Sequence, residues 1–460
     1  MGTHIEDLVN KKIEQIKNNE NVFDSGKVIK VKDYIIEVSG LENVRFFEKV
    51  NIWEKGMGYV NQINENSVTV AIVKQYAPIR IGDIVNATGE QFKAIFTKEA
   101  IGRIVDLFGI DVLTGRAFEK IEYINMINPD LYIRKVIFDD NAIENPTIPI
   151  MDRRPVKRPM LTGIAGIDLI YPIGKGQRQL IIGDKRTGKT QICLDAIVNQ
   201  KKAIQEKGED VVCIYIAVGK TKKEIKSIYN ELLKRNALSY TMMVVSTNDD
   251  KPPVSSLIPY VGLSIAEEYM KMKKDVLVVI DDLKKHADIY REISLISNKT
   301  PGREAYPADI FYLHSRLLEK GCQYKNGGSI TILPIVETKG GDITDYISTN
   351  IISITDGQIV LSEKEFSRGN KPAINYGISV SRLGGAVQEK DVKKLGAEIR
   401  RKFLSYLETK EVYELANMDE MSPELQQKMK DGKEIQKLLN QDKFSPLTEK
   451  EIIERFQKFE

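Results

Sequence analysis

The chain has little of what several classes of protein depend on. Its 460 residues include three cysteines, three histidines and one tryptophan. The cysteines, Cys193, Cys213 and Cys322, are far apart in the sequence, which is typical of a reducing compartment and not of a disulfide framework. The histidines show no metal-ligand spacing, so the sequence gives no support for a zinc site or a histidine-based catalytic triad.

Charge and hydropathy exclude further classes. The chain has 68 Lys and Arg against 65 Asp and Glu, a formal charge of +3, and therefore lacks a chain-wide basic field that would hold nucleic acid. Its longest apolar runs, such as Val276 to Ile280, are far shorter than the roughly 20 residues that cross a membrane. The first residues carry no apolar core of a secretion signal. We expect a soluble protein of about three domains that binds no nucleic acid.

Two segments precede the centre of the chain. In residues 1–21, apolar side chains recur at helical spacing behind Thr3-x-x-Glu6, a capping-box pattern that predicts a short amphipathic arm. Residues 22–90 hold six short β-type runs separated by turn formers, which predict a small antiparallel β-barrel. A linker rich in Asn, Asp and Pro follows at about 120–150.

The remaining residues predict a multidomain α/β chain with a sheet domain and a helical domain. Between 178 and 360, continuous apolar β runs alternate with helical stretches, which is typical of a parallel, doubly wound sheet with both faces covered. We expect the sheet domain to span 91–375. From about residue 388 the strand signals end. Helix starts at Ser422-Pro423 and Ser445-Pro446 then predict a helical bundle within 376–460.

The sharpest motif lies between the apolar strand Leu180 to Ile182 and a helical run that starts at Gln191. It fits G-x-x-x-x-G-K-[ST], in the strand-to-helix context in which such a loop binds phosphate. Its glycines let backbone N–H groups curl around an anion, its lysine would neutralise the β- and γ-phosphates, and its last hydroxyl would complete a magnesium shell. The motif residues are Gly183, Asp184, Lys185, Arg186, Thr187, Gly188, Lys189 and Thr190.

A second apolar strand ends in two carboxylates, Asp281 and Asp282. Asp281 would hold magnesium together with Thr190. A strand-terminal Asp can also do no more than cap the next helix. Because the phosphate loop is present, we favour the metal role for Asp281 and leave the capping role to Asp282.

A group that activates water is missing from its expected place. The strand Val211 to Val218 ends in Gly219-Lys220-Thr221-Lys222-Lys223, where related ring-forming proteins offer a Glu, and a cation cannot accept a proton from water. Glu224 lies one turn further on and could serve only if the loop bent back. We therefore expect a site that binds nucleotide and turns it over poorly. For Lys220, a solvated position at a helix start and a phosphate contact both stay open.

Five blocks of the sequence are similar to one family: Gln177 to Thr190, Pro301 to Pro307, Phe311 to Glu319, Ile352 to Gln358 and Gly377 to Arg382. In these blocks the chain resembles the alpha subunit of the F-type ATP synthase. The likeness runs from the amino-terminal arm to about residue 450. The catalytic beta subunit of that family has a differently worded loop and carries the Glu that is missing here.

The resemblance implies a β-barrel, a RecA-like P-loop domain and a helical domain. It also implies partners: three alpha and three catalytic beta-type subunits in a ring around a gamma-type shaft, with peripheral-stalk or adaptor subunits. Alpha sites of the family hold ATP or ADP with Mg²⁺ without turning it over, so this chain alone is expected to be non-catalytic. We expect a cytoplasmic location, at the inner face of the cell membrane through partner subunits.

Three residues match positions at the neighbour's catalytic site. Arg382 matches the arginine that alpha extends into that site, where its guanidinium would stabilise the transferring phosphoryl group. Ser353 and Ser379 match positions that line the same interface, and Pro301 to Pro307 matches a loop near the shaft. Without the resemblance, a loop Arg is more often a surface charge.

Other residues match the chain's own nucleotide site. The resemblance places Lys185 to Thr190 on phosphate and Asp281 and Glu337 near magnesium. Phe366 and Gln441 would lie by the base. Lys371 and Lys443 stand where Arg and Gln are usual, and Lys185-Arg186 replaces Arg-Gln, so the base contacts depart from the family pattern.

Three other roles are weighed against this one. A Lys-, Ile- and Asn-rich composition, a short carboxyl end and the diverged linker are similar to F-type-like ATPases of mycoplasmas, some linked to gliding. A Rho-like RNA translocase would need its own catalytic Glu and a stacking surface, which 7% aromatic residues do not favour. A purely structural ring spacer would have an empty site.

Overall fold

The computed structural model describes residues 24–126, 148–412 and 422–459. The predicted arm at 1–21 and most of the linker at 120–150 lie outside the described residues. The chain divides into two compact units, and the first consists of its residues up to Lys93 with Lys251–Pro253 and Ile293–Lys299. All other residues belong to the second unit.

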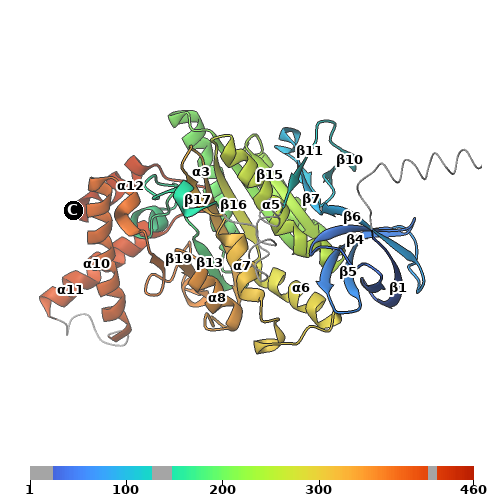
Figure 1. Ribbon diagram of the computed structural model, residues 1–460. Helices are drawn as coiled ribbons and strands as arrows, with labels where there is room; N and C mark the ends of the chain where they lie inside the picture. The colour runs from blue at the N-terminus through green and yellow to red at the C-terminus, as the bar shows by residue number, and fades with distance from the viewer. Residues whose placement is uncertain (1–23, 127–147, 413–421, 460) are drawn as a thin grey trace, which may run out of the picture. The chain divides into compact units, whose positions relative to one another are not determined.

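The first unit contains the predicted barrel, and that part of the fold is confirmed. Six antiparallel strands close in the order β1-β2-β5-β4-β3-β6 (Figure 1). Alternate Val and Ile side chains fill its interior, among them Val38, Val60 and Val70, as expected of a small barrel. The strands are β1 (Ser25–Lys32), β2 (Ile35–Ser39), β3 (Glu48–Ile52), β4 (Gly56–Ile63), β5 (Val68–Gln75) and β6 (Ile84–Gln91).

The second unit is built around one large sheet, whose main order is β10-β9-β8-β15-β14-β16-β18-β13-β19-β20. From β8 to β19 neighbouring strands run parallel, whereas β9, β10 and β20 run antiparallel to their neighbours. The strands are β8 (Ile104–Val105), β9 (Ile110–Asp111), β10 (Arg116–Ala117), β13 (Leu180–Asp184), β14 (Val211–Lys220), β15 (Thr241–Thr247), β16 (Asp275–Asp281), β18 (Ser329–Thr338), β19 (Gly357–Leu361) and β20 (Val380–Ser381).

Smaller strand pairs and helices surround this sheet. Strands β12 (Arg153–Arg154) and β17 (Cys322–Tyr324) pair beside β18, and β7 (Lys93–Phe96) pairs with β11 (Glu122–Asn125). The helices are α3 (Lys189–Lys207), α4 (Lys222–Lys234), α5 (Pro252–Lys271), α6 (Leu283–Ile296), α7 (Ile310–Leu318), α8 (Tyr346–Ile354) and α9 (Glu363–Ser367). The helical turns are η1 (Lys98–Ala100), η2 (Ile150–Asp152), η3 (Gly166–Ile170), η4 (Arg303–Ala305), η5 (Gly384–Val387) and η7 (Gln457–Phe459). The predicted parallel sheet with alternating strands and helices is confirmed.

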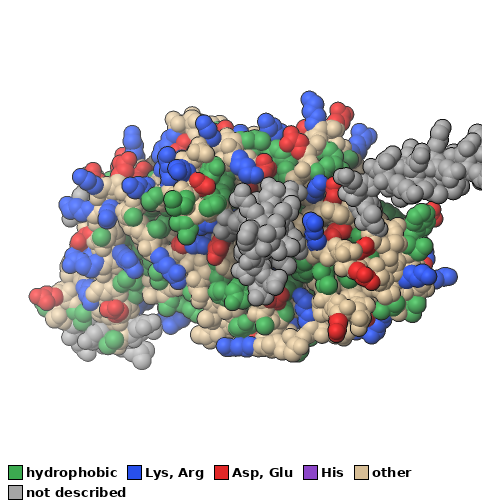
Figure 2. All heavy atoms as spheres, in the orientation of Figure 1, with side chains coloured by type: hydrophobic (Ala, Val, Ile, Leu, Met, Phe, Trp, Pro, Cys, Tyr) green, Lys and Arg blue, Asp and Glu red, His purple; other side chains and the backbone are tan. Residues whose placement is uncertain are grey.

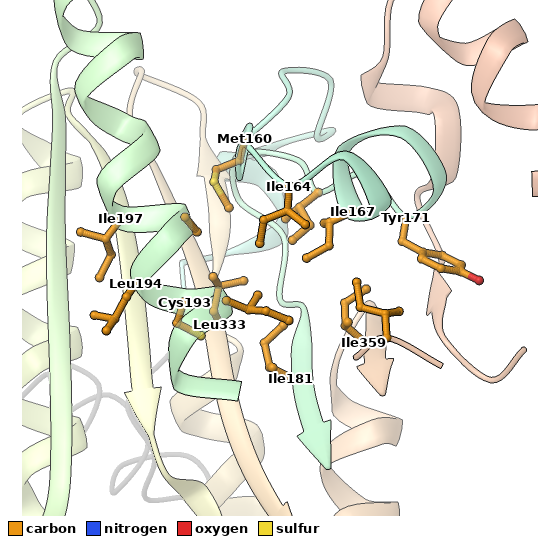
Figure 3. Packing of buried hydrophobic residues seen from close by; sticks show 14 of the residues in the cluster. Met160, Ile164, Ile167, Tyr171, Ile181, Cys193, Leu194, Ile197, Leu333 and Ile359 are labelled. Atoms are coloured by element: carbon orange, nitrogen blue, oxygen red, sulfur yellow. The ribbon is translucent and has the colours of Figure 1, made fainter. Parts of the chain in front are cut away.

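The central strands β13, β14, β15, β16 and β18 are buried on both faces over nearly their whole length, as the apolar strand runs predict. Figure 3 shows Ile181 of β13 and Leu333 of β18 beside Cys193 of α3, and Leu194 of α3 and Ile359 of β19 belong to the same buried cluster. At roughly 25 cal/mol per Å² of buried apolar surface, such clusters are the main stabilising contribution to the domain. The core therefore fixes the first turns of α3 against the end of β13, where the phosphate motif lies.

The carboxyl-terminal residues form helices α10 (Lys390–Val412), α11 (Pro423–Leu439) and α12 (Glu449–Phe456). The start predicted at Ser422 is confirmed, because its side chain accepts a hydrogen bond from Leu425 N. The start predicted at Ser445-Pro446 is wrong, and α12 begins after Thr448, which forms a capping box with Glu451. The preceding residues are held by a hydrogen bond to a distant loop instead, with Leu447 N donating to Gly163 O at 2.9 Å.

Two surface properties bear on function. Among the described residues, no helix has the length and apolar character that spanning a bilayer requires. Figure 2 shows acidic side chains lying between the Lys and Arg side chains across the visible face. That distribution agrees with the near balance of charge in the sequence.

Candidate nucleotide site

The phosphate motif forms a tight loop between β13 and α3, and its glycines explain why it can. Gly188 caps α3 with a φ of 103°, in the left-handed region that other residues rarely adopt. A Cβ at Gly183 would lie 2.5 Å from the Leu361 carbonyl oxygen of the neighbouring strand. The loop therefore opens at the carboxyl end of the parallel strands, against the N-terminus of a helix, where backbone N–H groups favour an anion.

Inside the loop, two side chains bind the same carbonyl. Lys189 Nζ donates to Asp184 O at 2.6 Å, and the Thr187 hydroxyl donates to it at 2.8 Å. Burial lowers the pKa of Lys189, against the opposing charges of Glu337 and the nearby aspartates. An entering phosphate would meet a lysine that is already held in place.

The other motif residues divide into a support and an exposed tip. The Asp184 carboxylate accepts the Thr338 hydroxyl at 2.7 Å and Gly341 N at 2.9 Å. These bonds tie the loop to the end of β18. Lys185 and Arg186 are exposed, and they form the solvent-facing tip of the loop.

Asp281, at the end of β16, collects donors from three elements. Its Oδ2 accepts the Thr190 hydroxyl of α3 at 3.0 Å and the Tyr215 hydroxyl of β14. Its Oδ1 forms an ion pair with Lys220 Nζ at 2.9 Å. The structure therefore joins the predicted metal pair, Thr190 and Asp281, directly to each other. Tyr215 was not predicted, although a lone hydroxyl in an apolar buried strand needs a polar partner.

The second carboxylate of the pair has the capping role that the sequence suggested. Asp282 Oδ1 accepts Lys285 N at 2.5 Å, in the first turn of α6. Burial, together with the charge of Asp281, raises the pKa of Asp282 to about 6. The cap on α6 is confirmed.

Of the two alternatives for Lys220, a solvated position at a helix start is wrong. Gly219, with a φ of 58°, turns the chain at the end of β14, and the Lys220 side chain is 18% exposed. Burial acts to lower the pKa of Lys220, but the ion pair with Asp281 outweighs it and raises the pKa. The residue that starts α4 is Thr221.

Glu224 is occupied by that same helix start. The backbone N and the hydroxyl of Thr221 donate to Glu224 Oε2 at 2.9 and 2.6 Å. These bonds lower the pKa of Glu224. The loop does not bend back, so Glu224 is committed to the cap.

Glu337 is the remaining predicted carboxylate. It lies next to Gly183 in the pairing of β18 with β13, and its charge acts on Lys189. Within the described parts of the chain, no hydrogen bond or ion pair of the Glu337 side chain is found. It is therefore the carboxylate that lies near the phosphate loop without a fixed partner.

The predicted base residues meet in one cavity of about 360 Å³ beside the loop. Phe366, Lys371, Gln441 and Lys443 line it together with Thr187 and Gly188 of the phosphate loop. Phe366 is 43% exposed, and Lys371 Nζ lies 5.9 Å from the centroid of its ring. A flat base can lie against an aromatic ring in such a position.

Two residues of this cavity have structural bonds that the sequence did not reveal. The Gln441 side chain donates to Gly163 O and Ser445 O and accepts Ala165 N, so its amide is used by the backbone. Asp195 of α3 also lines the cavity and accepts Phe444 N at 2.8 Å. Burial raises the pKa of Asp195 to about 6.

The donors around Asp281 fit magnesium in kind, because Mg²⁺ prefers oxygen ligands. A hydroxyl and a carboxylate, Thr190 and Asp281, lie together, and bound phosphates would supply further oxygens. The residues that the structure describes contain no cluster of three or more His, Cys, Asp or Glu side chains fit to hold a metal without such help. Lys220 is a competing cation at the same carboxylate.

Arg382 lies at the amino ends of the parallel strands, opposite the phosphate loop. It follows β20, whose Ser381 pairs with Gly357 at the start of β19. The phosphate loop follows β13, which pairs with β19 up to Leu361 at the end of β19. The five residues of β19 separate its start, beside Arg382, from its end, beside the phosphate loop, by about 13 Å. Arg382 is exposed, and its Nη2 donates to Ile352 O at 3.2 Å.

The two serines assigned to this edge differ. Ser353 is exposed beside Ile352, at the end of α8, and donates to Thr349 O at 2.9 Å. Ser379 is only 2% exposed. Its hydroxyl donates to Asn375 O and accepts Val360 N. The expectation that Ser379 lines an interface therefore needs correction, because its hydroxyl fastens β19 to the loop before β20.

A P-loop between a parallel strand and a helix, with a carboxylate at the end of a nearby strand and a cavity beside it, defines a P-loop nucleotide-binding domain. Residues 163–381 match the ATP synthase alpha/beta family, nucleotide-binding domain. The match covers the phosphate loop, Asp281, Glu337 and Phe366, and it supports membership of the alpha/beta family and the binding of ATP or ADP.

Proposed function

We propose that the chain is a non-catalytic, nucleotide-binding alpha-type subunit of a rotary F-type or F-type-like ATPase. It holds ATP or ADP at its own loop and lends Arg382 to the catalytic site of a neighbouring beta-type subunit. The observation that carries this proposal is the separation of the two groups. Arg382 is exposed at the sheet edge opposite the chain's own phosphate loop.

The chain's own site supports binding more than turnover. Hydrolysis needs an acceptor that orients and activates water. Lys220 occupies the end of β14 as an ammonium, Glu224 and Asp282 cap helices, and both oxygens of Asp281 already have donors. Glu337 is the carboxylate against which this part of the proposal has to be tested.

The residues around the loop have separate tasks when nucleotide is bound. Lys189 and the N-terminus of α3 would hold the phosphates, and Phe366 and Lys371 would flank the base. Thr190 and Asp281 would hold a magnesium ion, which would neutralise phosphate charge and fix its geometry. The closed hydrogen-bond network around Asp281 keeps these side chains in place in the absence of ligand.

The role of Arg382 follows from its charge and its exposure. A guanidinium delivered from a neighbour stabilises negative charge on a transferring phosphoryl group, with an effect of roughly 10³ to 10⁵ on the rate in phosphoryl-transfer systems. Within the described parts of the chain, Arg382 donates through Nη2 to one backbone carbonyl, which leaves other N–H groups of the guanidinium for such a phosphate.

The partners proposed are beta-type catalytic subunits in a three-plus-three ring, a gamma-type shaft, and peripheral-stalk or adaptor subunits that link the ring to a membrane. The family match at 163–381 supports a ring with other subunits. The Lys-, Ile- and Asn-rich composition supports a specialised member, such as one that drives a mechanical output other than proton flow.

The test is reconstitution. The chain is purified alone and together with a beta-type partner, and ATP turnover and bound nucleotide are measured. We expect negligible turnover alone and robust turnover in the complex. Brisk hydrolysis by the isolated chain would contradict the proposal, and Glu337→Gln in the isolated chain would then show whether Glu337 is responsible.

A further inference from the structure

The carboxylate that would face magnesium already has a cation of the chain's own. Lys220 Nζ lies 2.9 Å from Asp281 Oδ1, and the Asp281 side chain is 2% exposed. In P-loop proteins this strand-end carboxylate acts on Mg²⁺ bound to the phosphates. Here its negative charge is balanced before any metal arrives.

The position of Lys220 is built by the fold. Residue Ala217 of β14 pairs with Asp281 of β16, and the chain then turns at Gly219. Asn248 N donates to Lys220 O at 3.0 Å, which fixes the backbone at this point. A Lys held in this way has lost freedom that a surface Lys keeps, so the ion pair belongs to the architecture of the site.

The ammonium of Lys220 also has capacity left over. A Lys side chain has three N–H donors, and the bond to Asp281 uses one of them. Thr190 joins the same carboxylate through its other oxygen at 3.0 Å, and Thr190 follows the phosphate-loop lysine directly. Lys220 and Thr190 therefore share the Asp281 carboxylate, and Thr190 lies where a β- or γ-phosphate would bind.

We propose that Lys220 takes over much of the work of Mg²⁺ at this site, so that the chain binds nucleoside di- and triphosphates with an affinity that depends little on magnesium. The inference rests on the proposed nucleotide binding and adds to it the nature of the cation. Lys220, at the end of β14, and Lys189, in the first turn of α3, would then both act on the polyphosphate. Mg²⁺ can still join Thr190 and the phosphates, but it gains less because Asp281 is already paired.

The test is a comparison of affinities. The full chain is stripped of nucleotide, and the Kd for ATP is measured by calorimetry in excess Mg²⁺ and again in EDTA. We expect the two values for the natural chain to agree within about threefold, whereas Lys220→Gln is expected to bind at least about tenfold more weakly in EDTA than in Mg²⁺. Lys220→Arg keeps the charge and should behave like the natural chain.

A matched control is Lys222→Gln. Lys222 is two residues away, 71% exposed and paired with Asp249 at 2.9 Å, so its removal should leave the ratio of the two Kd values unchanged. A second readout needs no nucleotide. Mg²⁺ alone should raise the thermal unfolding temperature of Lys220→Gln, whose Asp281 has lost its ion pair, more than that of the natural chain.

The outcomes separate the two proposals. Binding by the natural chain that collapses in EDTA would overturn the inference and leave the proposed nucleotide binding intact. Equal weakening of Lys220→Gln in Mg²⁺ and EDTA would make Lys220 an ordinary phosphate ligand, and it too would overturn the inference. Absence of binding by the natural chain in both buffers would overturn the proposed function itself.

Discussion

The carboxyl and amino ends of the parallel strands differ in how far their polar side chains are hydrogen-bonded within the chain. At the carboxyl edge, Lys189, Thr190, Asp281 and Lys220 bond to one another or to the loop backbone, and the network is mostly buried. At the amino edge, Arg382 is exposed. A closed network is suited to holding a ligand in one geometry. An exposed guanidinium is suited to a ligand that another molecule brings.

The largest effect is expected at the exposed edge. In the complex with a beta-type partner, Arg382→Ala should lower turnover by roughly 10³-fold or more, because the charge of the transferring phosphoryl group loses its stabilising cation. Turnover is measured by phosphate release, and nucleotide content by extraction. Arg401→Ala is the control, since Arg401 is exposed and, among the described residues, its ion pair is with Glu398 of its own helix. Unaltered turnover in Arg382→Ala would exclude a role in the neighbour's site.

A smaller effect, of a different kind, is expected at the buried edge. Lys189→Ala should weaken binding of ATP to the isolated chain by roughly 10- to 150-fold, the range for the loss of a hydrogen bond to a charged group. Lys185→Ala removes an exposed lysine of the same loop and should weaken binding less. Calorimetric titration gives both constants. If both variants lost the same affinity, the loop tip would matter as much as its buried lysine.

The hydrogen-bond network around Asp281 can be weakened by removing one buried donor. Tyr215 is fully buried, and its hydroxyl donates to Asp281. Tyr215→Phe should lower stability by about 1–3 kcal/mol, because the buried carboxylate loses a donor and no water replaces it. Tyr312→Phe is the control, since Tyr312 is 61% exposed. Denaturant unfolding measures both, and equal stability of the two variants would show that the Tyr215 bond contributes little.

Local signals were enough to predict much of this comparison. The motif from Gly183 to Thr190 places its strand, glycines and helix within a dozen residues, and Asp282 follows a strand and precedes a helix in the usual order of a cap. The barrel strands were equally local, because each is a short apolar run ended by a turn. In the loop and the cap the residues that interact are close in sequence, whereas the closure of the barrel pairs β1 with the distant β6.

The parts that could not be predicted depend on pairing between distant residues. Lys220 meets Asp281 because β14 and β16 are neighbours in register, and no spacing in the sequence reveals that. Ser379 is buried because β20 folds back on β19. The misplaced start of α12 has another cause, since two capping signals lie three residues apart and the capping box at Thr448 formed.

The smallest expected effect is a change in the stability of the fold at acid pH, and it comes from two buried histidines. His286 and His314 are fully buried and lie with ring nitrogens 3.5 Å apart, and His286 Nε2 lies 3.0 Å from Ser256 O. Burial lowers the pKa of His286 to about 4 and that of His314 well below its usual value. The unfolded chain therefore binds protons that the folded chain refuses, and this part of the stability is lost as the pH falls below about 6.5.

Three carboxylates with raised pKa values act in the opposite sense. Burial raises the pKa of Asp168, Asp195 and Asp282 to about 6, so the folded chain binds those protons more readily, and stability is lost as the pH rises from about 3.8 through 6. Between pH 7.5 and 5.5 the two sets offset each other. Replacing both histidines (His286→Gln with His314→Gln) should therefore leave a variant that gains stability in acid relative to the natural chain, by about 1 kcal/mol per histidine removed. Thermal unfolding at the two pH values checks this as a narrowing gap between variant and natural chain. A gap that stays constant would mean that the histidine pair does not titrate differently on folding, and that the carboxylates alone set the acid response behind the phosphate loop.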